Sequence, residues 1–273
     1  MIRVPGYRLS IKKTKQIPTP MFYRLFPLRV LLFLLFLITI SSTLLATHNR
    51  AGEIRVELVD TTCTSDNSLT VRATVITYTK ASSISVDRDT LTICWGDGVC
   101  ERVGRANGLG TPPQGVILEN DTKRNLYIAT HTYSARATYT ISMTDPNRNA
   151  GILNVNAPFS EQVPFHIQTE YTFLNPQVQG CNNSPILLQP PIDIGCVGQV
   201  FTHNPNAFDA DNDSLSYEFI TPMQEVDFSA PNYQEVTEIE PGIDNQITID
   251  SLTGDIVWNA PQKAGEYNIA ILI

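Results

Sequence analysis

Three carboxylates stand at alternate positions in one short acidic segment, namely Asp209, Asp211 and Asp213. Carboxylates spaced in this way can converge on a hard cation, and Ca²⁺ takes six to eight oxygen ligands in flexible acidic loops. Without a cation, the three charges would repel one another. The segment lacks the glycine and glutamate spacing of an EF-hand loop. We therefore predict a calcium site here, and an Asx-rich turn that uses the same side chains for backbone hydrogen bonds is the alternative.

A tight turn joins two short strands predicted for Asp89–Cys94 and Val99–Val103. Glycine adopts the positive φ of such turns without steric cost, and aspartate tolerates it better than most residues. The tryptophan at its start has enough area to anchor a small β core. We interpret the whole turn as structural, including its aspartate, and its residues are Trp95, Gly96, Asp97 and Gly98.

Enzymatic motifs are missing from the sequence. It contains no Gly-x-Ser-x-Gly, His-Glu-x-x-His, phosphate-loop or dinucleotide fingerprint. The four histidines are scattered, and His131 lies on an alternating strand, where a hydrogen-bonded structural role is expected. Sequence spacing does not test for a glycosidase-type pair of catalytic carboxylates, because such partners lie far apart in a chain. We assign no catalytic residue and predict that the protein is not an enzyme.

The positioning elements are short strands throughout. Tyr139, Ile141 and Met143 alternate with Thr and Ser, a period of two that indicates a half-buried strand. About seven short strands in this part of the chain fit a two-sheet sandwich. Besides the hairpin and Thr138–Met143, we predict strands at Glu53–Val59, Leu69–Tyr78, Leu126–Tyr133 and Val163–Phe173, with a Gly- and Pro-rich loop over Gly104–Asn120.

The second half shows the same alternation after the acidic segment, with Leu215, Tyr217 and Phe219 separated by polar residues. Further strands or linker segments are predicted at Pro185–Pro191, Gly195–Phe201, Ile247–Asp250, Ile256–Trp258 and Ala264–Ile271. A length of 273 residues suits two domains after an N-terminal segment. We predict an all-β protein with a segment 1–46 and two domains, 47–181 and 182–273.

The N-terminal segment has the order of a secretory signal. Residues 1–29 are basic, residues 30–40 are apolar, and residues 41–46 are mostly small. We predict cleavage after Ala46, with an uncleaved signal anchor as the alternative, because the apolar run approaches the bilayer span of about 20 residues if counted through Leu45. Either way the remainder is exported, to the extracellular space or the outer-membrane surface, and meets a membrane only if the segment stays uncleaved.

The charge of the exported part argues against nucleic acid as a partner. The formal net charge is −8, but seven of the 19 basic residues lie before Ala46, where there is no acidic residue. The rest of the chain contains the other 12 basic residues and all 27 acidic residues. Phosphate binding needs a positive footprint, which this part of the chain lacks. Acidity is compatible with divalent cations and also with simple solubility.

Export changes the interpretation of the five cysteines. In an oxidising compartment, cysteines close in sequence tend to be bridged. Cys94 and Cys100 flank one turn, so a bridge across the hairpin is geometrically reasonable. Cys181 and Cys196 bracket a Pro-rich connection and are predicted to bridge it, which leaves Cys63 over. Zinc is disfavoured because no Cys-x-x-Cys spacing or histidine cluster occurs.

Trp95-Gly96-Asp97-Gly98, followed by His131-Thr132-Tyr133 and Ala137-Thr138-Tyr139-Thr140-Ile141, resembles the polycystic kidney disease (PKD) domain. That family is an immunoglobulin-like sandwich of extracellular proteins. The chain departs from the family at Ala137, where glycine is usual, and in a longer loop before His131. The resemblance implies an immunoglobulin-like β-sandwich for residues 47–181.

The second half resembles the putative-Ig and cadherin-like domains of bacterial surface proteins. It carries their Asp-x-Asp-x-Asp-Ser-Leu-x-Tyr segment from Asp209, an Asp-x-x-Thr-Gly turn from Asp250 that leads into the strand of Trp258, and an Ala-Gly-x-Tyr end at Tyr267. In addition, residues 47–54 and 139–155, which include Thr-Asp-Pro-Asn-Arg-Asn, look like the N-terminal region of large surface proteins of gliding Bacteroidota. Some of those proteins carry a gliding-motility or type IX sorting module, which does not appear in this sequence.

Together these features predict a cell-surface structural or adhesion protein associated with gliding motility or attachment. Its partner would be a surface glycan or a protein. A carbohydrate-binding module or an accessory part of a secreted hydrolase is the alternative, and an exposed Trp or Tyr strip would favour the former. Trp95 and Trp258 are both expected in cores, which counts against such a strip.

Overall fold

The computed structural model describes residues 49–59, 69–83, 87–175 and 180–273, so the predicted signal segment lies outside these ranges. Within them every regular element is a β-strand, apart from a single 3-10 turn, η3 (Ser160–Gln162). None of the described residues forms a helix long and apolar enough to cross a bilayer. The prediction of an all-β protein is confirmed for this part of the chain.

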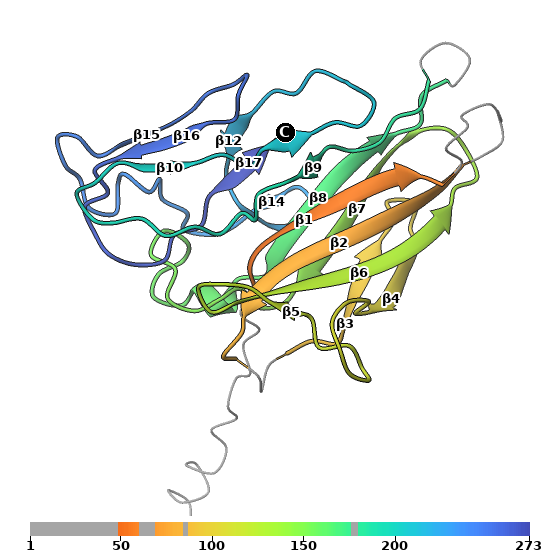
Figure 1. The fold of residues 1–273 in the computed structure, drawn as a ribbon, viewed down its shortest axis with the longest axis horizontal. Helices are drawn as coiled ribbons and strands as arrows, with labels where there is room; N and C mark the ends of the chain where they lie inside the picture. Colours follow the sequence, from red (N-terminus) through yellow and green to blue (C-terminus); the bar gives the residue numbers. More distant parts are fainter. Residues whose placement is uncertain (1–48, 60–68, 84–86, 176–179) are drawn as a thin grey trace, which may run out of the picture. The chain divides into compact units, whose positions relative to one another are not determined.

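The first sheet is built on β2, whose long apolar alternation buries Val71, Ala73 and Val75 on one face. β2 pairs antiparallel with β1 on one side and with β6 on the other. β1, β2 and β6 run alongside one another in Figure 1. The sheet has the order β1-β2-β6-β5 and comprises β1 (Asn49–Leu58), β2 (Thr70–Lys80), β6 (Thr122–Thr132) and β5 (Val116–Ile117).

The second sheet has the order β4-β3-β7-β8 and is also antiparallel. The period-two segment lies at its centre: Tyr139 faces Tyr171 across β7 and β8, and Met143 faces Ile167. Its strands are β4 (Cys100–Gly104), β3 (Thr90–Cys94), β7 (Thr138–Asp145) and β8 (Phe165–Thr172).

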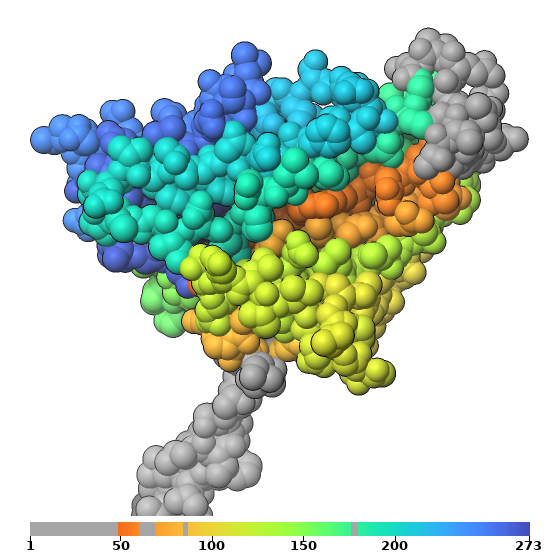
Figure 2. Space-filling model, in the orientation of Figure 1, coloured from red at the N-terminus to blue at the C-terminus, as the bar shows by residue number. Residues whose placement is uncertain are grey.

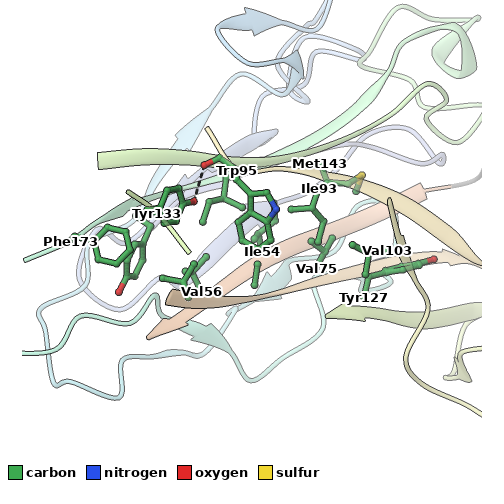
Figure 3. Packing of buried hydrophobic residues seen from close by; sticks show 14 of the residues in the cluster. Ile54, Val56, Val75, Ile93, Trp95, Val103, Tyr127, Tyr133, Met143 and Phe173 are labelled. Atoms are coloured by element: carbon green, nitrogen blue, oxygen red, sulfur yellow. Dashed lines mark hydrogen bonds between the residues drawn. The ribbon is translucent and has the colours of Figure 1, made fainter. Parts of the chain in front are cut away.

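Both sheets send apolar side chains into one buried cluster, shown in Figure 3. Trp95, Ile93 and Ile141 are fully buried there. Burial of each such side chain stabilises the fold by about 1.5–3 kcal/mol. The cluster comprises Ile54, Val56, Val71, Ala73, Val75, Ile93, Trp95, Val103, Tyr127, Tyr133, Ile141, Met143, Phe165, Tyr171 and Phe173.

Residues 180–273 form smaller antiparallel sheets. One has three strands in the order β10-β16-β15: β10 (Phe201–His203), β16 (Ile256–Asn259) and β15 (Gln246–Ile249). The other strands form three pairs: β9 (Ile186–Leu187) with β11 (Ala207–Phe208), β12 (Glu218–Ile220) with β17 (Ala270–Leu272), and β13 (Met223–Glu225) with β14 (Phe228–Ser229).

Several predicted strands are shorter in the structure because their backbone groups find other partners. β12 begins at Glu218, since the N–H of Tyr217 donates to the carbonyl of Ser251. β17 begins at Ala270, since Glu266 and Asn268 bond instead to residues 153–154. All described residues fall in one compact unit of the chain. The boundary predicted between residues 181 and 182 stays a prediction.

Candidate functional site

The turn after β3 has the geometry that its two glycines allow. The N–H of Trp95 donates to the carbonyl of Val99, and the N–H of Val99 donates to Oδ1 of Asp97. Gly96 has φ +80°, and a Cβ there would lie 2.7 Å from the carbonyl oxygen of Thr140. A larger residue would therefore suffer both backbone strain and a clash. Glycine is needed here for the close approach to β7.

His131 and Tyr133, on β6 and just after its end, hold this turn in place. The His131 ring stacks on Trp95 at 4.9 Å, and its Nε2 lies 2.7 Å from Oδ2 of Asp97. The hydroxyl of Tyr133 donates to the carbonyl of Trp95 at 2.8 Å, the dashed line in Figure 3. Burial raises the pKa of Tyr133 far above its usual value, so this donor stays protonated. The Trp-Gly-Asp-Gly and His-Thr-Tyr segments therefore form one structural cluster.

A His–Asp pair is also half of a catalytic triad, in which the carboxylate orients the imidazole. Burial disfavours the charged form of Asp97, but hydrogen bonds from His131 and Val99 outweigh it, so the pKa of Asp97 lies below its usual value. Among the residues that the structure describes, no Ser, Thr or Cys side chain hydrogen-bonds His131. In this arrangement the pair joins the turn to β6.

The acidic segment does not bring its three carboxylates together. Oδ1 of Asp209 accepts hydrogen bonds from the N–H groups of Asp211 and Asp213, at 2.8 and 3.1 Å. The carboxylate of Asp211 points elsewhere and accepts from the backbone and side-chain nitrogens of Asn183. Asp213 is exposed. The described ranges hold no group of three acidic, His or Cys side chains placed to bind a metal. This geometry is the Asx-rich turn, and calcium binding stays a prediction.

Asp209→Ala is expected to destabilise the protein by about 1–2 kcal/mol, because two partly buried N–H groups lose their acceptor. The loss should be equal in millimolar Ca²⁺ and in chelator, as measured by urea unfolding. Asp213→Ala, which truncates an exposed side chain of the same turn, is the matched control and should change stability by less than about 0.5 kcal/mol. A wild-type midpoint that rises with Ca²⁺ would instead support a metal site.

One predicted disulfide is present and one is wrong. Cys94 and Cys100 face each other across β3 and β4 and are bonded, with S–S 2.10 Å. Cys196 is a free, exposed cysteine, so the predicted bridge from Cys181 to Cys196 does not form. Cys181 is itself disulfide-bonded. Its nearness to Cys196 in sequence did not bring the two sulfurs together. Cys63 lies outside the described residues.

Sequence reasoning missed a charged group that lines a pocket. Asp87 pairs with Nη2 of Arg105 at 2.7 Å and with Nζ of Lys123 at 2.5 Å, and both cations are almost fully buried. Burial opposes ionisation of Asp87, but hydrogen bonds from Arg105 and Lys123 prevail and lower its pKa. Arg88 pairs in turn with Asp145. The pocket is lined by Asn49, Thr77, Asp87, Asn125, Tyr127 and Asp145, among others. Both carboxylates are paired with cations of the protein itself, which favours a structural role.

The edge strand β1 is covered by the chain that follows residue 180. The N–H of Ser184 donates to the carbonyl of Val56, and its Oγ accepts from the N–H of Val56. Oδ1 of Asn183 accepts from the N–H of Leu58. Figure 2 shows green-cyan residues of this segment against the orange atoms of β1. Unpaired edge groups invite association with other chains. Through Asn183, the acidic residue Asp211 therefore helps to close this edge.

A second set of contacts joins two β regions. We call residues 49–175 the first region and residues 180–273 the second region. We call this set of contacts the clasp and define it as Arg50, Asn149, Asn154, Glu266 and Asn268. The Glu266 carboxylate accepts from Arg50 at 3.0 Å and from Asn149. The Asn154 side chain makes two hydrogen bonds with the backbone of Asn268. Its Oδ1 accepts from the N–H of Asn268, and its Nδ2 donates to the carbonyl oxygen of Asn268. Resemblance alone singled out the stretches 47–54 and 139–155. Their side-chain spacing did not predict that Arg50 and Asn149 contact Glu266.

Comparisons of the chain with protein-family models, with curated proteins and with solved structures give no match.

His166 is expected to make stability fall as the pH drops. It is buried on β8, with Nδ1 2.8 Å from Oγ1 of Thr144 and Nε2 2.9 Å from Oε1 of Gln168. Burial lowers its pKa and the charge of Arg148 adds to this, while Gln168 and Glu225 oppose it.

Because the unfolded histidine, with a pKa of about 6.5, binds protons more readily, stability declines as pH falls through that value. The decline ends below the folded pKa. Urea midpoints between about pH 7.5 and 5.5 should show it, and His166→Gln should flatten it. An unchanged slope in His166→Gln would contradict this assignment.

Proposed function

We propose that the protein is an exported structural or adhesion protein of a bacterial cell surface, built of two immunoglobulin-like β-sandwich regions and associated with attachment or gliding. The observation that carries the proposal is a hairpin disulfide, Cys94–Cys100, in an all-β chain that follows a basic and then apolar leader. Disulfides persist in oxidising compartments outside the cytosol.

The contacts within residues 49–273 suit a load-bearing role. The first region buries one large apolar cluster, and its edge strand β1 is covered by the segment at Asn183 and Ser184. Two separate sets of contacts join the two regions: the clasp, and the hydrogen bonds of Asn183 and Ser184 with β1. A protein held together in this way can present a surface at a distance from the membrane without bending at one hinge.

Export is tested by expressing the full chain in a diderm bacterial host. We expect a mature protein that begins at Thr47, is digested by protease added to intact cells, and has Cys94 and Cys100 resistant to alkylation. An intact N-terminus in the membrane fraction, with the same protease sensitivity, would support the signal anchor. Full-length chain in the cytosol with reduced Cys94 would contradict the proposal.

Adhesion is tested with cells that carry the exported chain. Such cells should be retained under flow on a surface better than cells with an empty vector, and protease treatment should abolish the difference. A glycan array distinguishes the carbohydrate-binding alternative. That alternative lacks a tryptophan platform, because both tryptophans of the chain, Trp95 and Trp258, are buried. Retention equal to the empty vector would remove the adhesive role.

A further inference from the structure

Arg148 is a buried arginine whose partners come mainly from the other β region. It is 2% exposed, in the connection between β7 and β8. Its Nη1 donates to Oδ1 of Asn268 at 2.5 Å, and its Nη2 donates to the carbonyl oxygens of Met223 at 2.7 Å and Pro164 at 3.0 Å. Thus two of these three acceptors lie beyond residue 180.

No carboxylate neutralises this guanidinium within the described part of the chain. Arg148 forms no ion pair there, although its Cζ lies 5.5 Å from the centre of the Phe165 ring. Burial lowers its pKa to about 10, which still leaves it charged at neutral pH. A buried charge is costly unless hydrogen bonds satisfy it. By itself the first region supplies one acceptor, the carbonyl of Pro164, and the second region supplies the other two.

Independent apolar contacts support the same junction. Ile152, Val155 and Val163 of the first region pack with Ala230 and Tyr233 of the second in a small buried cluster. Backbone bridges join Ile152 to Glu266 and Val155 to Tyr233. Apolar burial holds the regions together without selecting an orientation, whereas Nη1 and Nη2 of Arg148 reach these acceptors only when Met223 and Asn268 are both in place.

We propose that Arg148 couples the two β regions, so that the second cannot open without leaving a buried charge unsatisfied in the first and the two unfold as one cooperative unit. This coupling would hold whether or not the protein acts at a cell surface. It gives the Thr-Asp-Pro-Asn-Arg-Asn stretch a role: Asn149 and Arg148 are its last two residues, and both bind the 266–268 segment.

The coupling is tested by hydrogen exchange with mass spectrometry on the full chain, with and without Arg148→Ala. Peptides covering β2 report on the first region, and peptides covering β15 and β16 report on the second. In the wild type, both sets should exchange through a common opening. In Arg148→Ala, exchange of β15 and β16 should be roughly tenfold faster or more, because charged hydrogen bonds to Met223 and Asn268 are lost, while β2 changes less than about threefold.

The matched control is Arg72→Ala, which removes an exposed arginine of β2 that pairs with Glu57. It should leave both sets of peptides within about twofold of the wild type. Asn268→Ala tests the junction from the other side and keeps the test informative if Arg148→Ala does not fold. It should also accelerate β15 and β16 selectively, and adding it to Arg148→Ala should add little. Equal acceleration of both regions in Asn268→Ala, or no acceleration, would overturn the proposal.

Discussion

Trp95→Ala is expected to destabilise the protein by about 3–5 kcal/mol, the cost of truncating a buried tryptophan. Trp95 is fully buried in the main apolar cluster, stacks on His131, and its Nε1 donates to Glu101 at 3.0 Å. The substitution leaves a cavity in this cluster and removes the ring against which His131 packs. Urea unfolding followed by circular dichroism measures the loss.

Two variants bracket this result. Trp95→Phe keeps most of the apolar volume and should cost less than the alanine variant. Ile128→Ala removes an apolar side chain that is 44% exposed on β6, and should cost about 0.5 kcal/mol or less. If Trp95→Ala cost no more than Ile128→Ala, then Trp95 would not anchor the core, and the Trp-Gly-Asp-Gly turn would not be the structural centre of the first region.

Asp87→Ala is expected to cost about 3–5 kcal/mol, because it leaves Arg105 and Lys123 buried without their anion. Glu57→Ala is the matched control: its partner Arg72 is exposed, so its loss should cost less than about 1 kcal/mol. Both values come from urea unfolding at neutral pH. A cost for Asp87→Ala as small as that for Glu57→Ala would mean that the two cations find other anions or water.

The same carboxylate predicts acid sensitivity. Because the folded pKa of Asp87 is depressed, its stabilisation is complete above the unfolded value of about 3.9 and is lost as pH falls through the folded pKa. Wild-type stability should therefore fall steeply below about pH 4. Asp87→Asn should already be less stable at neutral pH and should fall less steeply in acid. Parallel curves for the two proteins would show that another group controls the acid transition.

Local patterns in the chain predicted the local parts of the fold. Tyr139, Ile141 and Met143 lie on β7 as their alternation indicates, since strand geometry sends successive side chains to opposite faces. The turn at Gly96 and the bridge from Cys94 to Cys100 involve residues that are near neighbours in sequence. In such cases spacing constrains geometry directly, and little else in the chain can change it.

Side-chain partners far apart in sequence were not predictable in this way. The carboxylate of Asp209 accepts hydrogen bonds within its own turn and that of Asp211 accepts from Asn183, and their spacing in the sequence did not reveal these separate partners. The bridge between Cys181 and Cys196 failed because proximity in sequence did not bring the sulfurs together. No spacing rule could have placed Asp87 beside Lys123, because they belong to separate segments of the chain that only tertiary packing brings together.

By itself, the sequence determined that the described chain is made of β-strands, and where the tight turn at Gly96 falls, because backbone sterics and period-two burial act over a few residues. The tertiary structure alone decided that Arg148 meets Met223 and Asn268, and that the segment at Asn183 covers β1. A buried charge or an open strand edge must be satisfied by whichever groups packing brings close, and those groups can lie anywhere in the chain.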